Sequence, residues 1–143
     1  MNIKLILNYL VILIISLIIA SCSNHKSNFK MNNIYTQKLN ALEVSMVSYM
    51  KEAEPNYTQS DVDKCLEILK EYLQKVGDSR SKSEGKEAVK SAVVSLNKLN
   101  EKCDYDLIET GEREQIADII ISAAAEKGYT TLQEDITEEW REW

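Results

Sequence analysis

The sequence SDVDKCLEILKEYLQKVG, residues 60–77, has the clearest helical pattern in this chain of 143 residues. Ser60 is a suitable N-cap, and Asp61 and Asp63 follow in the first turn, where the helix dipole favours negative charge. Gly77 suits the position just after the last turn. The large apolar residues between them recur every three or four positions and form one stripe: Val62, Leu66, Leu69, Leu73 and Val76. This stretch therefore predicts an amphipathic helix that buries one face against other helices.

Apolar residues recur at helical spacing in three further stretches, which predict helices over residues 34–53, 85–102 and 110–127. In the last stretch, Ile121 and Ala124 widen the apolar face, so we expect this helix to be the central one. No stretch shows the strict alternation of a half-buried strand. The sequence predicts an all-α fold, a single small bundle of about four helices over residues 34–143. One short C-terminal turn would follow the last helix.

The first 22 residues, MNIKLILNYLVILIISLIIASC, have the pattern of a secretory leader. Lys4 supplies the positive charge, and residues 5–20 are apolar apart from one asparagine, one tyrosine and one serine. A retained transmembrane anchor is the alternative. Sixteen helical residues span roughly 24 Å, however, which is less than the ~30 Å hydrocarbon core of a bilayer. The pattern therefore favours a signal peptide that is removed.

The end of the leader, Ile19-Ala20-Ser21-Cys22, resembles the lipobox of bacterial lipoprotein precursors. The resemblance implies a signal peptide over residues 1–21, cleavage before Cys22, and lipid on its sulfur and new amino group. Residues 22–33 would then form a lipidated tether to the membrane, because two or three acyl chains anchor stably. The implied location is the periplasm or cell exterior, and Ser23 resembles the outer-membrane default in bacteria with two membranes. The alternative is an ordinary secreted protein with a free Cys22.

Charge is distributed unevenly along the mature chain. Residues 22–100 carry 12 basic and 10 acidic side chains, for a net charge of +2. Residues 101–143 carry 4 basic and 13 acidic side chains, for a net charge of −9. An acidic surface argues against nucleic acid or anionic lipid as a direct partner. It suits a basic protein partner, or simply solubility.

If Cys22 carries lipid, Cys65 and Cys103 are the two remaining cysteines. An even pair in an oxidising compartment predicts a disulfide, which would close a loop of 103 − 65 = 38 residues. The alternative is two buried free thiols, because cysteine is among the most buried residue types. The expected length of helix between Cys65 and the loop that joins the two helices differs by six residues, or ~9 Å, from the length between that loop and Cys103. This offset weakens the disulfide prediction.

The C-terminal nine residues, DITEEWREW, contain both tryptophans of the protein. Thr137 is able to cap one helical turn that places Trp140 and Trp143 on the same face. In one interpretation this turn folds back and the indoles pack onto the bundle. In the other it is an exposed acidic and aromatic patch that binds a basic partner. The candidate partner-binding residues are Glu138, Glu139, Trp140, Glu142 and Trp143.

The residues expected in the folded domain favour no catalytic chemistry. The one histidine, His25, lies in the tether, so neither a zinc site nor a histidine base for a nucleophile is predicted in the bundle. Asp61-Val62-Asp63 begins like a calcium loop, but the loop's third oxygen ligand and its turn glycine are missing. We therefore expect no metal, no cofactor and no enzymatic activity. A hydrolase that uses paired carboxylates is the least favoured alternative.

These observations predict a lipid-anchored helical protein of the cell envelope with a non-catalytic accessory or protein-binding role. The domain also resembles small helical immunity proteins, which bacteria carry against secreted toxins. The runs 99–129 and 135–143 are similar to other small bacterial helical proteins as well. The first resemblance implies the main alternative function, an inhibitor that masks the basic surface of a toxin. It implies no particular site residue.

Overall fold

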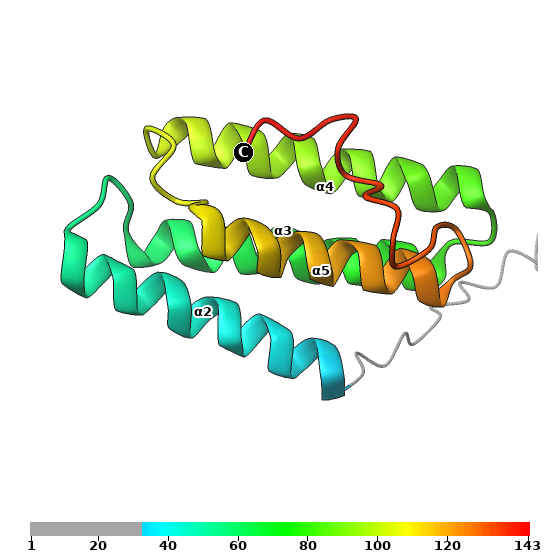
Figure 1. Ribbon diagram of the computed structural model, residues 1–143, viewed down its shortest axis with the longest axis horizontal. Coiled ribbons are helices and arrows are strands. Elements are labelled where there is room, and N and C mark those ends of the chain that lie inside the picture. The colour runs from blue at the N-terminus through cyan, green and yellow to red at the C-terminus, as the bar shows by residue number, and fades with distance from the viewer. Residues whose placement is uncertain (1–32) are drawn as a thin grey trace, which may run out of the picture.

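The computed structural model describes residues 33–143, and it confirms the predicted all-α class. Four helices and no strand occur in this range (Figure 1). The signal peptide, residues 1–21, lies outside the described residues, as do Cys22 and all of the tether but its last residue. Among the described helices, none is long and apolar enough to cross a membrane.

The helices are α2 (Asn33–Ala53), α3 (Gln59–Asp78), α4 (Lys82–Lys102) and α5 (Thr110–Glu126). Each helix runs antiparallel to the one before it, because the connections between them are short (Figure 1). The helices α3 and α5 contact each other, and α2 and α4 pack on opposite sides of this pair. After α5 the chain reverses and returns along α4, so the C-terminus lies over that helix (Figure 1).

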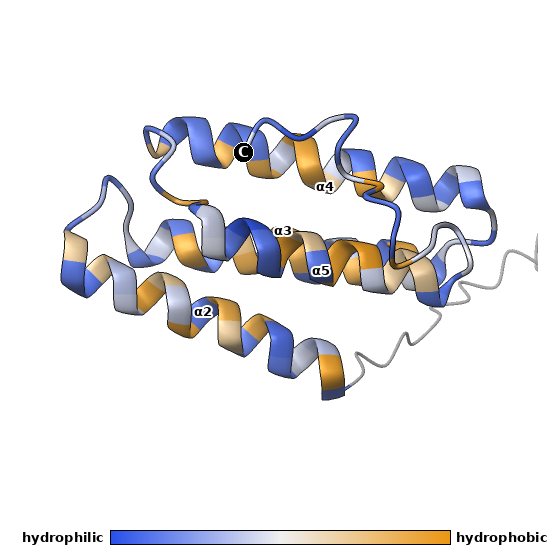
Figure 2. Cartoon of the chain, viewed as in Figure 1, coloured by the Kyte–Doolittle hydropathy of each residue, from blue (hydrophilic) through white to orange (hydrophobic). Residues whose placement is uncertain are grey.

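The helices α3 and α5 together form the centre of the bundle, because each of them contacts all three other helices. The wide apolar face of α5 predicted this place for α5 alone. Ile116, Ile119 and Ile120 are fully buried, and Ala123 and Ala124 are nearly so. Burial of one such large aliphatic side chain stabilises a fold by about 1.5–3 kcal/mol. Figure 2 shows the apolar residues concentrated along α5, whereas the chain that follows it is largely hydrophilic. The apolar stripe predicted in α3 is buried as well.

Two helix starts differ from the prediction by two or more residues, and α3 continues past its predicted end at Gly77 to Asp78. The N-cap of α3 is Thr58 and not Ser60, because the Asp61 carboxylate accepts hydrogen bonds from the backbone N–H and the hydroxyl of Thr58 at 2.9 and 2.7 Å. The helix α4 begins at Lys82, three residues before the predicted Gly85. There Ser81 acts as the N-cap, and its Oγ accepts from the N–H of Glu84 at 3.2 Å.

Candidate functional site

The C-terminal segment, residues 129–143, contains a turn over residues 135–141 that is fixed by its own side chains. Asp135 accepts hydrogen bonds from the N–H and the hydroxyl of Thr137, at 2.9 and 2.5 Å. The backbone N–H groups of Trp140 and Arg141 both donate to the Thr137 carbonyl at 3.1 Å. Arg141 then forms an ion pair with Asp135 at 2.7 Å. The predicted short C-terminal turn is therefore present, and Thr137 at its start is completely buried.

Asn97 of α4 holds this segment against the bundle. Its Nδ2 donates to the Trp140 carbonyl at 2.7 Å, and its Oδ1 accepts from the N–H of Glu142 at 3.3 Å. The Asn97 side chain is buried beneath the segment, so these bonds form away from bulk water. Sequence reasoning did not single out Asn97, because nothing near it in the chain indicates partners 43 and 45 residues away.

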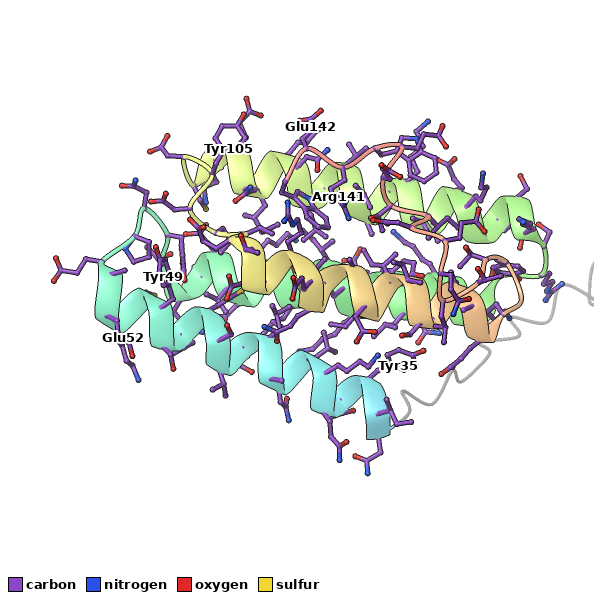
Figure 3. All side chains as sticks on the ribbon, viewed as in Figure 1. Tyr35, Tyr49, Glu52, Tyr105, Arg141 and Glu142 are labelled. Atoms are coloured by element: carbon purple, nitrogen blue, oxygen red, sulfur yellow. The ribbon has the colours of Figure 1, made fainter. Side chains whose placement is uncertain are left out.

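The tryptophans and the acids of the predicted patch have different surroundings. Trp140 and Trp143 are partly buried and pack against the hydrophobic core, and the Arg141 guanidinium lies 5.3 Å from the centre of the Trp143 ring. Glu138, Glu139 and Glu142 are exposed. Figure 3 shows Glu142 pointing away from the bundle and Arg141 pointing toward it. The indoles thus contribute to the fold, while the carboxylates face solvent.

A groove of about 480 Å³ separates the turn from α4. Its walls come from both elements: Val94, Asn97, Lys98 and Glu101 on α4, and Glu139, Trp140, Arg141 and Glu142 on the turn. Both signs of charge line the groove, but its two acids from the turn, Glu139 and Glu142, form no ion pair with any residue of the 33–143 range. The groove is open and amphipathic, which suits a protein side chain better than a small apolar ligand.

The cations of the acidic C-terminal third are mostly engaged within the chain. Lys102 pairs with Asp61 at 2.7 Å. Lys127 donates to the carbonyls of Gly77 and Ser79, both at 3.0 Å. Arg141 pairs with Asp135. Three of the four basic residues of this third therefore have partners, and they do not neutralise the exposed acids of the turn.

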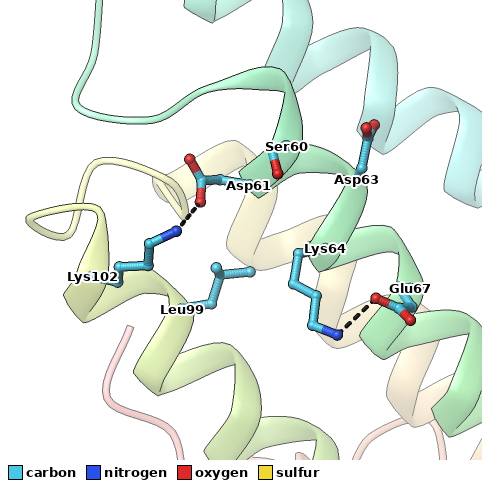
Figure 4. Close-up of a pocket in the computed structure, with 7 residues that line it drawn as sticks. All are labelled: Ser60, Asp61, Asp63, Lys64, Glu67, Leu99 and Lys102. Atoms are coloured by element: carbon cyan, nitrogen blue, oxygen red, sulfur yellow. Dashed lines mark hydrogen bonds and ion pairs between the residues drawn. The ribbon is translucent and has the colours of Figure 1, made fainter.

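A second polar pocket, of about 470 Å³, lies between the start of α3 and the end of α4 (Figure 4). Its charged side chains are held by neighbours: Asp61 by Lys102 and Lys64 by Glu67, each at 2.7 Å, while Asp63 accepts from Gln59 at 2.9 Å. Leu99 forms its apolar wall. With its charges engaged in this way, the pocket offers little to a charged ligand, and its ion pairs fix the α3 and α4 ends.

Asp61 gives the fold a pH dependence. Hydrogen bonds from Lys102 and Thr58 lower the pKa of Asp61 from 3.8 to about 2. A carboxyl group whose pKa is lower in the folded chain stabilises the fold above its unfolded pKa, and the effect disappears as the pH falls toward 2. We expect Asp61→Asn to lower the free energy of unfolding at pH 7 by about 1–2 kcal/mol, allowing for screening at the exposed Lys102, and to flatten its fall between about pH 5 and 2.

Urea unfolding at a series of pH values would measure this effect. Asp63→Asn is the matched control, because Asp63 lies in the same turn of α3 but is exposed and bonds only to Gln59 among the contacts described above. We expect the control to keep the acid dependence of the parent protein. An Asp61→Asn variant with an unchanged slope between pH 5 and 2 would contradict the assignment.

Cys65 and Cys103 are both buried, and the structure holds them as free thiols. Burial, and then the nearby Cys103, raise the pKa of Cys65 to about 12, and burial raises the pKa of Cys103. Because thiolates react and thiols do not, neither group is suited to nucleophilic catalysis at neutral pH. The disulfide stays a prediction of the sequence.

The native protein is expected to resist a thiol-specific reagent at neutral pH, whether or not Cys65 and Cys103 are bonded. Labelling of the protein unfolded in urea, without reductant, distinguishes free thiols from a disulfide. There, free thiols would label at Cys65 and Cys103, and a disulfide would leave both unlabelled. Mass spectrometry of the labelled peptides gives the readout, and reduced protein in urea is the positive control. Rapid labelling of the native protein would contradict the burial of these side chains.

Lys38 of α2 and Ser122 of α5 form a pair of the kind that serves as base and nucleophile in some hydrolases. Lys38 Nζ lies 3.0 Å from Ser122 Oγ. Asp118, however, pairs with Lys38 at 2.7 Å and accepts from Ser122 Oγ at 3.1 Å. Asp118 thus engages both side chains, and the contacts of this cluster join α2 to α5.

No three histidine, cysteine or acidic side chains of residues 33–143 are grouped so that they could hold a metal ion. Comparison of the chain with protein families, with curated proteins and with solved structures found no match. The function must therefore be argued from the chain itself.

Proposed function

We propose that this protein is a lipid-anchored, non-catalytic protein of the cell envelope that binds a basic protein partner through its C-terminal turn. The observation that carries the proposal is the exposure of Glu138, Glu139 and Glu142 on a turn that Asn97 holds against α4. The ion pairs described for residues 33–143 do not neutralise these three carboxylates.

The turn is suited to recognition because it is ordered before a partner arrives. Its backbone is fixed by Asp135, Thr137 and Asn97, so little conformational entropy is lost on binding. Exposed carboxylates of one sign accelerate association with a basic surface and set its orientation. The exposed edge of Trp140 adds apolar contact at the rim of the groove, and tryptophan is enriched at binding hot spots.

The place in the cell follows from the lipobox-like sequence that ends at Cys22. Lipid there would hold the bundle at a membrane that faces the periplasm or cell exterior. Two kinds of basic partner fit this position. One is a secreted toxin, which would make the protein an immunity-type inhibitor, and the other is a basic face of a resident envelope protein.

The decisive experiment removes charge from the turn and leaves its packing intact. Deletion of residues 135–143 would also remove the buried Ile136 and Thr137, so a lost partner would not show which group binds it. We therefore choose the triple variant Glu138→Gln, Glu139→Gln and Glu142→Gln. Full-length protein and variant are captured from envelopes of the producing cell, and bound proteins are identified by mass spectrometry.

The control carries the same change of charge on other faces of the bundle. It replaces three exposed acids, one from each of α2, α4 and α5: Glu52→Gln, Glu87→Gln and Glu114→Gln. We expect a basic partner that is retained by the control, lost from the triple variant, and released by salt because the contact is electrostatic. Retention of every partner by the triple variant would refute the proposed surface. A toxin would be captured only after it is added to the envelopes, whereas a resident envelope protein would copurify with this protein without any addition.

A further inference from the structure

The outward face of α2 carries almost no charge, in contrast to the other helices of the bundle. Of the 12 exposed residues of α2, only Lys51 and Glu52 are charged, and both lie in its last turn. Charged side chains make up 7 of the 10 exposed residues of α3, 8 of the 10 in α4 and 4 of the 6 in α5. Depletion of charge distinguishes the core of a protein interface from ordinary surface, so this face of α2 is suited to a contact with protein.

The residues along the middle of this face have the spacing of a seam between two helices. They recur at alternating intervals of three and four residues: Ile34, Gln37, Ala41, Val44, Ser48 and Lys51. This is the spacing of the a and d positions of a coiled coil, and this stripe lies on the side of α2 opposite to its buried residues. Val44 is 66% exposed and Ile34 is 51% exposed. The stripe is thus a second packing face of α2, which none of the described helices covers.

The place of α2 in the bundle leaves this face accessible. The helix contacts α3 and α5 but not α4. In Figure 1 it forms one outer edge of the bundle, whereas the C-terminal turn lies over α4 at the opposite edge. A contact on the outward face of α2 therefore leaves the surface that we propose for a basic partner uncovered.

We propose that this face of α2 packs against the same face of a second copy of the chain. A surface that meets its own copy across a twofold axis brings like charges together if it carries any, so a self-contact favours an uncharged face. A strongly charged partner would find no opposite charge along most of this stripe. Ala41 and Ser48 are small side chains that let the two helices approach closely, and Val44 supplies apolar contact between them.

The two α2 helices are parallel and in register in this dimer. The orientation rests on the proposed lipid at Cys22, which precedes Asn33 by 33 − 22 = 11 residues. A flexible stretch of this length reaches roughly 18 Å, so two anchored copies begin α2 near the same bilayer. The polar Gln37 and Ser48 weaken the seam, so we expect the dimer to form where the anchors concentrate the protein in one membrane.

Disulfide cross-linking in membranes of the producing cell tests the contact. Full-length Ala41→Cys and Ser48→Cys are oxidised separately and analysed on a non-reducing gel. We expect a covalent dimer from each, because only a parallel, in-register pair places two positions ~10 Å apart along the helix each opposite its own copy. The matched control is Ser91→Cys, since Ser91 is exposed on α4. The parent protein is a second control, because Cys65 and Cys103 are buried.

Substitution of Val44 tests the seam itself. In the Ser48→Cys background, Val44→Glu should reduce the cross-linked fraction roughly tenfold, because two carboxylates then face each other. The matched control is Leu132→Glu, since Leu132 is also 66% exposed but lies in the loop after α5. Val44→Lys produced together with Val44→Glu should restore the dimer. High salt should leave the parent contact intact, because the seam is largely uncharged, whereas salt releases the proposed basic partner.

Each other outcome overturns the proposal. A dimer from only one of the two cysteine variants would indicate an antiparallel or shifted pair, and a dimer from neither would show that α2 does not meet its copy. An equal yield from Ser91→Cys would indicate random collision, and so would undiminished cross-linking in Val44→Glu. The mass of the N-terminal peptide shows separately whether Cys22 carries lipid. The capture experiment on the C-terminal turn does not depend on the dimer, so the two proposals fail separately.

Discussion

Gly85→Ala is expected to lower the free energy of unfolding by about 1–3 kcal/mol, the typical cost of overpacking a well-packed site. The expectation is unusual, because a glycine inside a helix is normally less stable than alanine by roughly 0.5–1 kcal/mol. Here an alanine Cβ would lie 2.2 and 2.4 Å from Cδ2 and Cε2 of Tyr129. No pair of non-bonded carbon atoms tolerates that distance, so the ring or the helix must move.

The Tyr129 ring is not free to move cheaply. It is buried between α4 and the loop after α3, and its hydroxyl accepts from Ser79 Oγ at 3.1 Å and lies 3.3 Å from the Ser79 carbonyl. Displacement of the ring would break these contacts and would shift the start of the C-terminal segment. Gly85 therefore permits the close approach of that segment to α4.

The control is Gly111→Ala in the first turn of α5. Nothing lies within 4 Å of a Cβ built on Gly111. Alanine there should stabilise the protein by about 0.4–1 kcal/mol, because it lowers the conformational entropy of the unfolded chain. The two substitutions are chemically identical and differ in expected sign. Urea unfolding followed by far-UV circular dichroism measures both. In a Tyr129→Ala background the cost of Gly85→Ala should disappear, and a cost that persists there would refute the contact.

The fold was predictable because it depends on local periodicity. The stripe from Val62 to Val76 and the wide apolar face of α5 are visible in the sequence, and both are buried as expected. Helix ends were less predictable, because several residues near each end can act as a cap. Thr58 and Asp61 form a reciprocal pair that Ser60 cannot match, so α3 begins before the predicted cap. Such differences of a few residues do not alter the bundle.

The arrangement of the C-terminal segment was only half predictable. The sequence left two interpretations open for its tryptophans and acids, and the structure places the two groups in different surroundings. The contacts that decide this are with Gly85 and Asn97, each more than 40 residues away from its partner in the chain. In the sequence, a glycine at the predicted start of a helix looks like a helix boundary, and an asparagine in a helix looks like a solvated side chain. Long-range packing gives no local signal.

Asn97→Ala is expected to release the C-terminal turn from α4 while the bundle stays folded. The substitution leaves the Trp140 carbonyl and the Glu142 N–H without the bonds that Asn97 now makes at 2.7 and 3.3 Å. Loss of one partner from a buried hydrogen bond costs about 1–3 kcal/mol. The C-terminal segment is short, and the Asn97 side chain, which belongs to α4, bonds to the backbone of this segment. The cost of losing these bonds should therefore favour local release of the segment over global unfolding.

Tryptophan fluorescence reports this release selectively, because both tryptophans of the protein, Trp140 and Trp143, lie in the segment. We expect a red-shifted emission for Asn97→Ala with nearly unchanged helical circular dichroism. The control is Lys98→Ala, since Lys98 is exposed, lines the same groove and is adjacent in the helix. If the emission wavelength of Asn97→Ala equals that of the parent protein, the indoles hold the turn without the Asn97 side chain. Release would have a further consequence, because a mobile turn presents its acids without a fixed geometry and should bind a basic partner more weakly.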